Sequence, residues 1–152
     1  MRPTDIALAI THRLEQVRAA IADAARQAGR RAEDIRLIAV TKTLPADAVT
    51  AAVAAGQRDF GESTLQDALT KLPLFAQQPL HWHFIGHLQS NKAKLIPGHF
   101  TWLHSLDSAA LARRLSRAAQ ESGAQLHKYL PMPGILSPGC CLHIVLALTV
   151  LY

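Results

Sequence analysis

The sequence predicts an α/β fold with a parallel sheet, in the form of an incomplete (β/α) TIM-barrel of about four strand–helix units. Short apolar runs alternate four times with segments of helical periodicity, an order typical of parallel strands joined by right-handed helical crossovers. The chain has 152 residues, whereas a complete eight-stranded barrel usually needs about 250. We therefore expect a domain with a real core but little more than half of a barrel.

Residues 5–28 are expected to form a leading amphipathic helix, because apolar side chains recur there at spacings of three and four. These side chains are Ile6, Ile10, Leu14, Val17, Ile21 and Ala24 or Ala25. Thr4 suits the N-cap position, and Gly29 suits the end of the helix. The arginines around its end, Arg26, Arg30, Arg31 and Arg36, are interpreted as a solvated basic edge.

The run from Ile35 to Lys42, IRLIAVTK, is expected to be a strand buried on both faces. Pro45 then suits the start of a helix. Lys42 therefore lies at the carboxyl end of a buried strand, where barrels build their active sites. Two interpretations of Lys42 follow from its position. In the first, the aliphatic stem of Lys42 lies on the rim of the core and its ammonium is in water. In the second, the amine is partly buried and acts as a nucleophile that forms a Schiff base.

Three further strand–helix pairs complete the expected fold. The helix that follows the first strand is expected at residues 45–55. The further expected strands are residues 58–62, 81–86 and 101–106, and their helices are residues 63–72, 89–95 and 108–122. Asp107 or Ser108 is expected to cap the last helix and Gly123 to end it.

Composition limits the classes of partner. Lys and Arg number 16 against 11 acidic residues, which gives a net charge of +5. This balance is compatible with phosphate-bearing ligands, from a small molecule to a nucleic acid. Aromatic residues make up only 5%, too few for base-stacking platforms, so no nucleic acid partner is expected. A basic nucleic-acid-binding module remains an alternative, suggested by Arg113, Arg114 and Arg117, although a solvated helix face is the preferred explanation of these arginines.

Cysteine usage and apolar runs predict a cytoplasmic protein without a membrane partner. Cys140 and Cys141 are neighbours and form no disulfide framework. The amino-terminal segment lacks the apolar core of a signal peptide. The run from Leu142 to Leu151 is too short to cross a bilayer as a helix.

Three segments carry a family resemblance. LIAVTKTLPADAVTAAVAAGQRDFGES, HWHFIGHLQSNKAKLI and the strand that ends in HSLD closely resemble the YggS/PROSC family. These are pyridoxal-phosphate-binding proteins of vitamin B6 homeostasis, similar in fold to the N-terminal barrel of alanine racemase. The resemblance covers about residues 5–126. It implies pyridoxal 5'-phosphate (PLP) as cofactor, a role in intracellular PLP homeostasis without efficient turnover, and PLP-dependent apoenzymes as partners.

The resemblance also implies site residues. Lys42 matches the lysine that carries PLP as a Schiff base, which favours the second interpretation of this residue. Ser63 stands where the family usually has asparagine, and a hydroxyl offers fewer hydrogen bonds than an amide. His83 lies near the cofactor or is a core histidine with a local hydrogen bond. No catalytic residue is expected, although weak alanine-racemase-type activity remains an alternative.

The spacing of His81, His83 and His87 invites a metal interpretation, because residues two apart on a strand share a face. His87 follows Gly86 in a turn, and no carboxylate or thiol completes a ligand set. We therefore expect no metal site.

The resemblance ends near Leu126, so we divide the chain into a partial PLP-binding barrel, residues 1–126, and a divergent tail, residues 127–152. We expect a truncation or frameshift of the reading frame at this point. The family's later phosphate-binding segments are then missing, and a fragment without function is a further alternative. A half-barrel with open edges should be poorly stable as a monomer. The run from Leu142 to Leu151 is expected to pair as an edge strand or to drive self-association.

Overall fold

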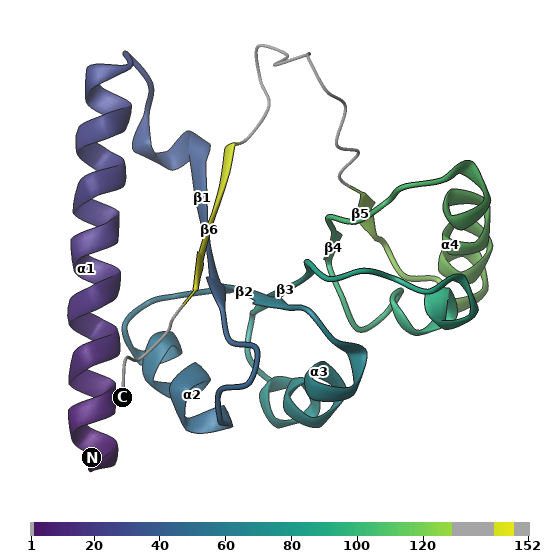
Figure 1. The fold of residues 1–152 in the computed structure, drawn as a ribbon, viewed down its shortest axis with the longest axis horizontal. Coiled ribbons are helices and arrows are strands. Elements are labelled where there is room, and N and C mark those ends of the chain that lie inside the picture. Colours follow the sequence, from purple (N-terminus) through teal and green to yellow (C-terminus); the bar gives the residue numbers. More distant parts are fainter. Residues whose placement is uncertain (1, 129–141, 148–152) are drawn as a thin grey trace. The chain divides into compact units, whose positions relative to one another are not determined.

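Strands and helices alternate along the chain in the predicted order (Figure 1). In this computed structural model the described residues are 2–128 and 142–147. The helices are α1 (Pro3–Gln27), α2 (Ala46–Ala54), α3 (Leu65–Lys71) and α4 (Ala109–Ser122), with 3-10 helices η1 (Ala32–Asp34), η2 (Leu72–Phe75) and η3 (Ser90–Leu95). The strands are β1 (Ile35–Val40), β2 (Asp59–Glu62), β3 (His81–Phe84), β4 (Trp102–Leu103), β5 (His127–Lys128) and β6 (Leu142–Ala147).

The chain divides into two compact units. The first contains α1, β1, α2 and β6, and the second begins at Phe60 and contains the elements from α3 to β5. Strand pairs are parallel in both units, namely β1 with β6, β3 with β4 and β4 with β5. An α/β fold with parallel strands is therefore confirmed. The division at residue 126 stays a prediction, and so does closure of these strands into a barrel.

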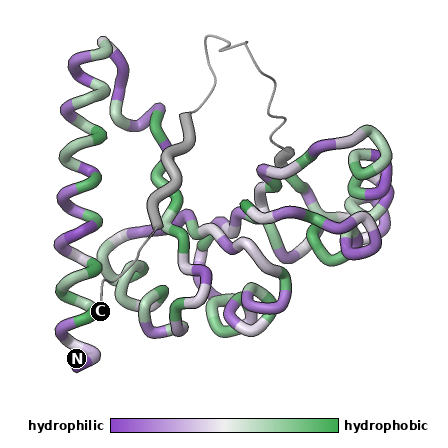
Figure 2. Tube along the Cα trace, in the orientation of Figure 1, coloured by the Kyte–Doolittle hydropathy of each residue, from purple (hydrophilic) through white to green (hydrophobic). Residues whose placement is uncertain are grey.

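Helix α1 covers the first unit with one apolar face. Ile10, Leu14, Ile21 and Ala25 are buried, and hydrophobic and hydrophilic residues alternate along the helix in Figure 2. The helix begins at Pro3, so the prediction of Thr4 as N-cap was wrong. Proline is well suited to the first helical position. The Arg2 backbone N–H is satisfied by the Asp5 carboxylate, 3.2 Å away.

Strand β1 is the buried strand that its sequence predicts. Its last four residues, from Leu37 to Val40, are all buried. Strand β6 pairs with β1 in parallel, in register from Ile35 opposite Leu142 to Val40 opposite Ala147. Pairing of the apolar tail is thus confirmed over residues 142–147. The rest of that run and both cysteines lie outside the described residues.

A buried amide ties the elements of the first unit together. The Gln57 side chain is buried and donates to the carbonyl oxygen of Leu37, at 2.7 Å, and to that of Asp59, at 2.8 Å. Arg18 of α1 donates to the Gln57 side-chain oxygen at 3.0 Å. Arg36 forms an ion pair with Asp59 at 3.0 Å and is half-buried. The interpretation of Arg36 as part of a solvated edge was therefore wrong. Its side chain is half-buried because it pairs with Asp59, a residue 23 positions further along the chain.

Aromatic side chains fill the core of the second unit, where the strand order is β2-β3-β4-β5. Phe60 and Trp82 lie 5.5 Å apart between ring centroids, and Phe84 meets Phe100 edge-on at 5.3 Å. The segment after β3 is a 3-10 helix, shorter than the helix predicted for residues 89–95. Helix α4 has the predicted ends: Ser108 caps it, and Gly123 ends it with a φ of 67°.

Nothing in the described part of the chain has both the length and the apolar composition of a membrane-crossing helix.

We predict that proline at both Ile144 and Val145 destabilises the first unit. Alternate residues of a parallel strand bond to the same neighbour, so two adjacent prolines remove N–H groups from both sides of β6. The exposed edge of β1 should then promote aggregation. Urea unfolding and light scattering should show a lower midpoint and larger particles. Unchanged values would contradict the pairing of β6 with β1.

Candidate functional site

Polar side chains gather at the carboxyl ends of the strands in each unit. In the first unit Lys42 follows β1 by two residues. In the second unit Ser63 directly follows β2, His83 is the third residue of β3, and His104 directly follows β4. Because these last three strands are neighbours in one parallel sheet, their carboxyl ends meet at the same edge. The predicted residues Ser63 and His83 thus lie at one edge of the second unit.

Lys42 stands in a tight turn at the end of the buried strand. The Leu44 backbone N–H donates to the Thr41 carbonyl oxygen at 3.0 Å, which closes a four-residue turn around Lys42 and Thr43. Thr41 is buried, whereas Lys42 and Thr43 are exposed. No hydrogen bond or ion pair holds the Lys42 ammonium among the residues that the structure describes. The expectation that the Lys42 amine is partly buried was therefore wrong, because its side chain is exposed.

The loop after β2 lies directly against the loop after β3. The Ile85 backbone N–H donates to the Glu62 carbonyl oxygen at 2.9 Å. A Cβ atom added to Gly86 would overlap the Ser63 carbonyl oxygen and lie 2.6 Å from the Ser63 carbonyl carbon. Only glycine permits this approach of two backbones. The position of Ser63 therefore depends on the absence of a side chain at Gly86.

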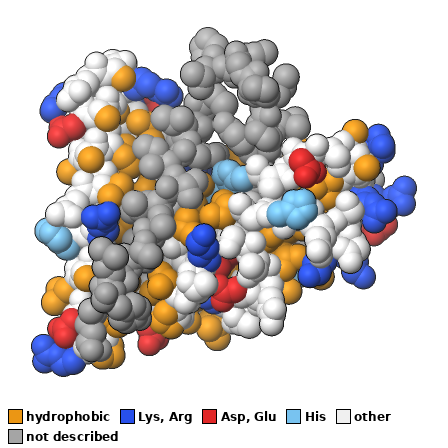
Figure 3. All heavy atoms as spheres, viewed as in Figure 1, with side chains coloured by type: hydrophobic (Ala, Val, Ile, Leu, Met, Phe, Trp, Pro, Cys, Tyr) orange, Lys and Arg blue, Asp and Glu red, His pale blue; other side chains and the backbone are white. Residues whose placement is uncertain are grey.

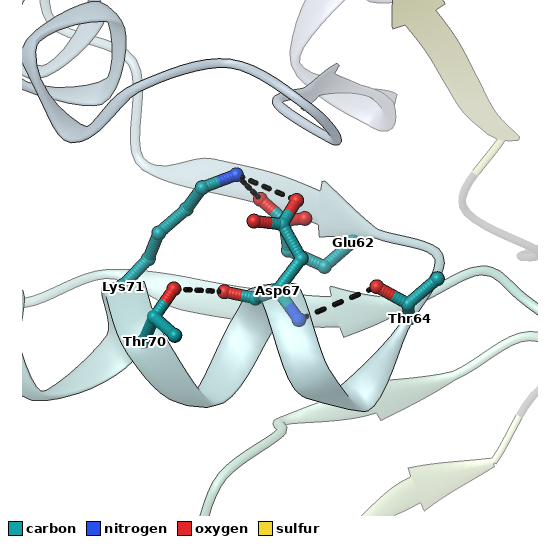
Figure 4. A network of polar contacts seen from close by, with 5 residues as sticks. All are labelled: Glu62, Thr64, Asp67, Thr70 and Lys71. Atoms are coloured by element: carbon teal, nitrogen blue, oxygen red, sulfur yellow. Dashed lines mark hydrogen bonds and ion pairs between the residues drawn. The ribbon is translucent and has the colours of Figure 1, made fainter.

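A buried ion network supports the same loop (Figure 4). The Lys71 ammonium donates to Glu62 at 3.0 Å and to Asp67 at 2.9 Å. The side chain of Glu62 is fully buried and that of Lys71 is 5% exposed. Thr64 caps α3 and accepts from the Asp67 backbone N–H at 3.3 Å. The network fixes the end of β2 against α3 on both sides of Ser63.

The burial of Lys71 corrects a simple expectation from the sequence. A lysine at the end of an amphipathic helix is normally a surface residue. The Glu62 and Asp67 carboxylates compensate for its removal from water, because buried charges persist in proteins when they are paired. No spacing rule predicts the contact with Glu62, which comes from another element.

His83 is held in a stack of rings. It is fully buried, lies opposite Trp102 in the strand register, and its ring is nearly parallel to that of Trp102, at 3° and 5.9 Å. Its Nδ1 atom lies 2.9 Å from Nε2 of His104, so one of these nitrogens donates and the other accepts. The sequence analysis did not single out His104. Its position two residues beyond Trp102, the register partner of His83, appears only once the strands are paired.

The other polar features of the described residues form no competing site. No three His, Cys, Asp or Glu side chains within residues 2–128 and 142–147 lie close enough to hold a metal ion. A cavity of about 420 Å³ in the second unit is lined by residues such as Leu80, Trp82 and Thr101, at the amino ends of β3 and β4. Because ligands of parallel α/β sheets bind at the carboxyl ends, we place the candidate site with Ser63 and His83.

Basic side chains lie on the outer surface of α4 (Figure 3). Arg113, Arg114 and Arg117 are exposed. Within the described residues, Arg114, Arg117 and Lys94 line a shallow cleft that also contains Glu121. This mixture of charges agrees with a solvated face.

Comparison with known proteins identifies relatives of the chain. No family model matches. The pyridoxal phosphate homeostasis protein of Pseudomonas aeruginosa is 51% identical over 107 residues, which are 70% of this chain and 46% of that protein. PipY of Synechococcus elongatus, solved without PLP, has a TM-score of 0.71 and 39% identity, over 89% of this chain and 59% of that chain. PipY with PLP bound has a TM-score of 0.68 and 41% identity, over 82% of this chain and 56% of that one.

These relatives confirm the resemblance on which the sequence analysis relied. The chain spans about half the length of the curated relatives that it matches.

We predict that Gly86→Ala destabilises the second unit by about 3 kcal/mol, because the backbone of Ser63 must move to admit the methyl group. Gly98→Ala is the comparison, since its Cβ meets no atom within 4 Å and only its φ of +87° opposes alanine. That variant should lose about 1 kcal/mol. Urea unfolding measures both. Equal losses would show that the close approach to Ser63 has no energetic weight.

We predict that Lys71→Met destabilises the protein by about 3–5 kcal/mol, because it leaves the buried Glu62 carboxylate without its ammonium. Lys92→Met, at an exposed position, should change the stability by less than about 0.5 kcal/mol. Adding Glu62→Gln to Lys71→Met should recover part of the loss. A loss below about 1 kcal/mol in Lys71→Met would contradict a buried ion pair.

Proposed function

We propose that this chain, a homologue of the pyridoxal phosphate homeostasis proteins, binds PLP through Lys42 and serves intracellular vitamin B6 homeostasis. The observation that carries the proposal is Lys42 itself, an exposed amine without a described ion-pair partner at the carboxyl end of a buried parallel strand. The PLP-bound relative, 41% identical, supports the choice of ligand.

The residues at the strand ends fit such a ligand. Lys42 would hold PLP through a Schiff base between its amine and the cofactor aldehyde, with one water released. When bound, PLP supplies an electron-accepting ring for amino-acid chemistry, while the protein supplies binding and orientation. The exposed turn around Lys42 gives the aldehyde access to the amine.

Ser63 and His83 are assigned supporting roles. We propose, from the family resemblance, that the Ser63 hydroxyl offers the cofactor a single hydrogen bond. His83 is fully buried and hydrogen-bonded to His104, so we propose that it supports the strand ends of the second unit rather than exposing its ring to solvent. Both assignments agree with the positions of these residues at neighbouring strand ends.

The proposed fold is part of a (β/α) barrel of the alanine racemase N-terminal type. Parallel pairing and the alternation of strands and helices support it. PLP-dependent apoenzymes are the proposed recipients of the cofactor.

The test is reductive labelling of the purified protein. Wild type, Lys42→Ala and Lys92→Ala are each incubated with PLP, reduced with borohydride and digested, and the label is located by mass spectrometry. Borohydride fixes the imine as a stable secondary amine. We expect one label per chain on Lys42, lost in Lys42→Ala and kept in Lys92→Ala, because Lys92 is an exposed lysine on η3.

Label spread over exposed lysines such as Lys92 and Lys94, at the same level in Lys42→Ala, would refute the proposed function. It would instead identify the chain as a fragment that keeps the sequence of the family without its binding site.

A further inference from the structure

Thr43 adopts a backbone conformation that suits glycine. Among the residues that the structure describes, it is the non-glycine residue with a positive φ, at 62°. A β-branched side chain in this left-handed region meets its own backbone and is a genuine outlier. The other positive-φ positions within residues 2–128 and 142–147 are Gly29, Gly56, Gly98 and Gly123. In this part of the chain glycine thus occupies four such positions, and threonine occupies the one beside Lys42.

The turn explains why Thr43 is strained. The Leu44 N–H to Thr41 carbonyl bond, at 3.0 Å, makes Lys42 the second residue of the turn and Thr43 the third. A positive φ at the third position alone is the requirement of a type II turn, in which glycine or asparagine is preferred there. Threonine is therefore unfavourable for the fold at this position.

Strained residues of this kind cluster at functional sites, where the side chain is kept despite the backbone conformation. Thr43 is exposed, and it directly follows the exposed Lys42. Its hydroxyl both donates and accepts hydrogen bonds. It therefore lies on the same turn as the amine that is proposed to hold the ligand.

We infer that Thr43 is a ligand-contacting residue of the Lys42 site, whose hydroxyl hydrogen-bonds an anionic oxygen of the bound phosphorylated pyridine aldehyde. This inference rests on the proposed function. The competing explanation is local: the hydroxyl bonds the turn itself and stabilises it, as Thr side chains often do. The two explanations predict opposite relations between stability and binding.

The experiment compares Thr43→Gly, Thr43→Ser and the control Thr50→Gly with wild type. Thr50 is exposed in the middle of α2, where glycine is unfavourable. Thermal unfolding of the ligand-free proteins is measured first. PLP affinity is then measured by absorbance, and the fraction of label on Lys42 by borohydride reduction and peptide mapping.

We expect Thr43→Gly to raise the Tm by about 3 °C while Thr50→Gly lowers it, because only the first substitution relieves strain. Thr43→Gly should also weaken PLP binding about tenfold, since a hydrogen bond to a charged group is lost. Thr43→Ser keeps the hydroxyl and should bind within about threefold of wild type. Stability and affinity thus move in opposite directions in Thr43→Gly.

Two results would overturn the inference. A lower Tm in Thr43→Gly would show that the threonine stabilises the turn. A higher Tm with unchanged affinity and labelling would show that the hydroxyl does not contact the ligand. If wild type itself carries no label on Lys42, the proposed function has failed, and the inference fails with it. These outcomes are distinguishable because the Tm is measured without PLP.

Discussion

The ion pair between Lys71 and Glu62 is the interaction on which the site edge of the second unit depends. A fully buried carboxylate is strongly unfavourable unless a cation and hydrogen bonds replace its water. Lys71 is the cation, and Asp67 holds the lysine from its own helix, 2.9 Å away. Because the lysine comes from α3 and Glu62 from β2, the pair forms only when the helix packs on the strand. The 10 residues from Glu62 to Lys71 are thereby folded into one rigid strand–helix corner.

This corner gives Ser63 its place through backbone contacts. Glu62 holds one side of Ser63 through its buried side chain and through its carbonyl oxygen, which accepts from Ile85. On the other side the absent side chain of Gly86 allows the two loops to touch. Backbone packing, rather than the Ser63 side chain, thus sets this position. Substitution of Ser63 should therefore disturb the loop less than substitution of Gly86.

The sequence predicts those features that local patterns encode. The apolar run before Lys42 predicts a buried strand, and the glycine after α4 predicts the end of that helix, because both depend on neighbouring residues alone. The burial of Lys71, the salt bridge of Arg36 and the contact of His83 with His104 join residues 9, 23 and 21 positions apart. Only tertiary packing, of α3 on β2 in the first case and of neighbouring strands in the other two, brings those partners together, so periodicity and spacing carry no signal for them. Thr43 is a different case. The sequence TKTLP is typical of an ordinary loop, and only the φ of Thr43 in the structure shows that its backbone is strained.

The tail shows how weakly strand pairing depends on sequence. Residues 142–147 follow the point where the family resemblance ends, yet they form a strand in register with β1. Parallel pairing uses backbone N–H and C=O groups, which every residue except proline provides. A short apolar segment rich in Ile, Val and Leu has the propensity for this role whatever its origin. Strand β1 carries Lys42 at its end, so any segment that covers its edge also protects the backbone that positions the amine. The chain spans about half the length of its curated relatives, and this pairing covers the edge of the strand most important for its proposed chemistry.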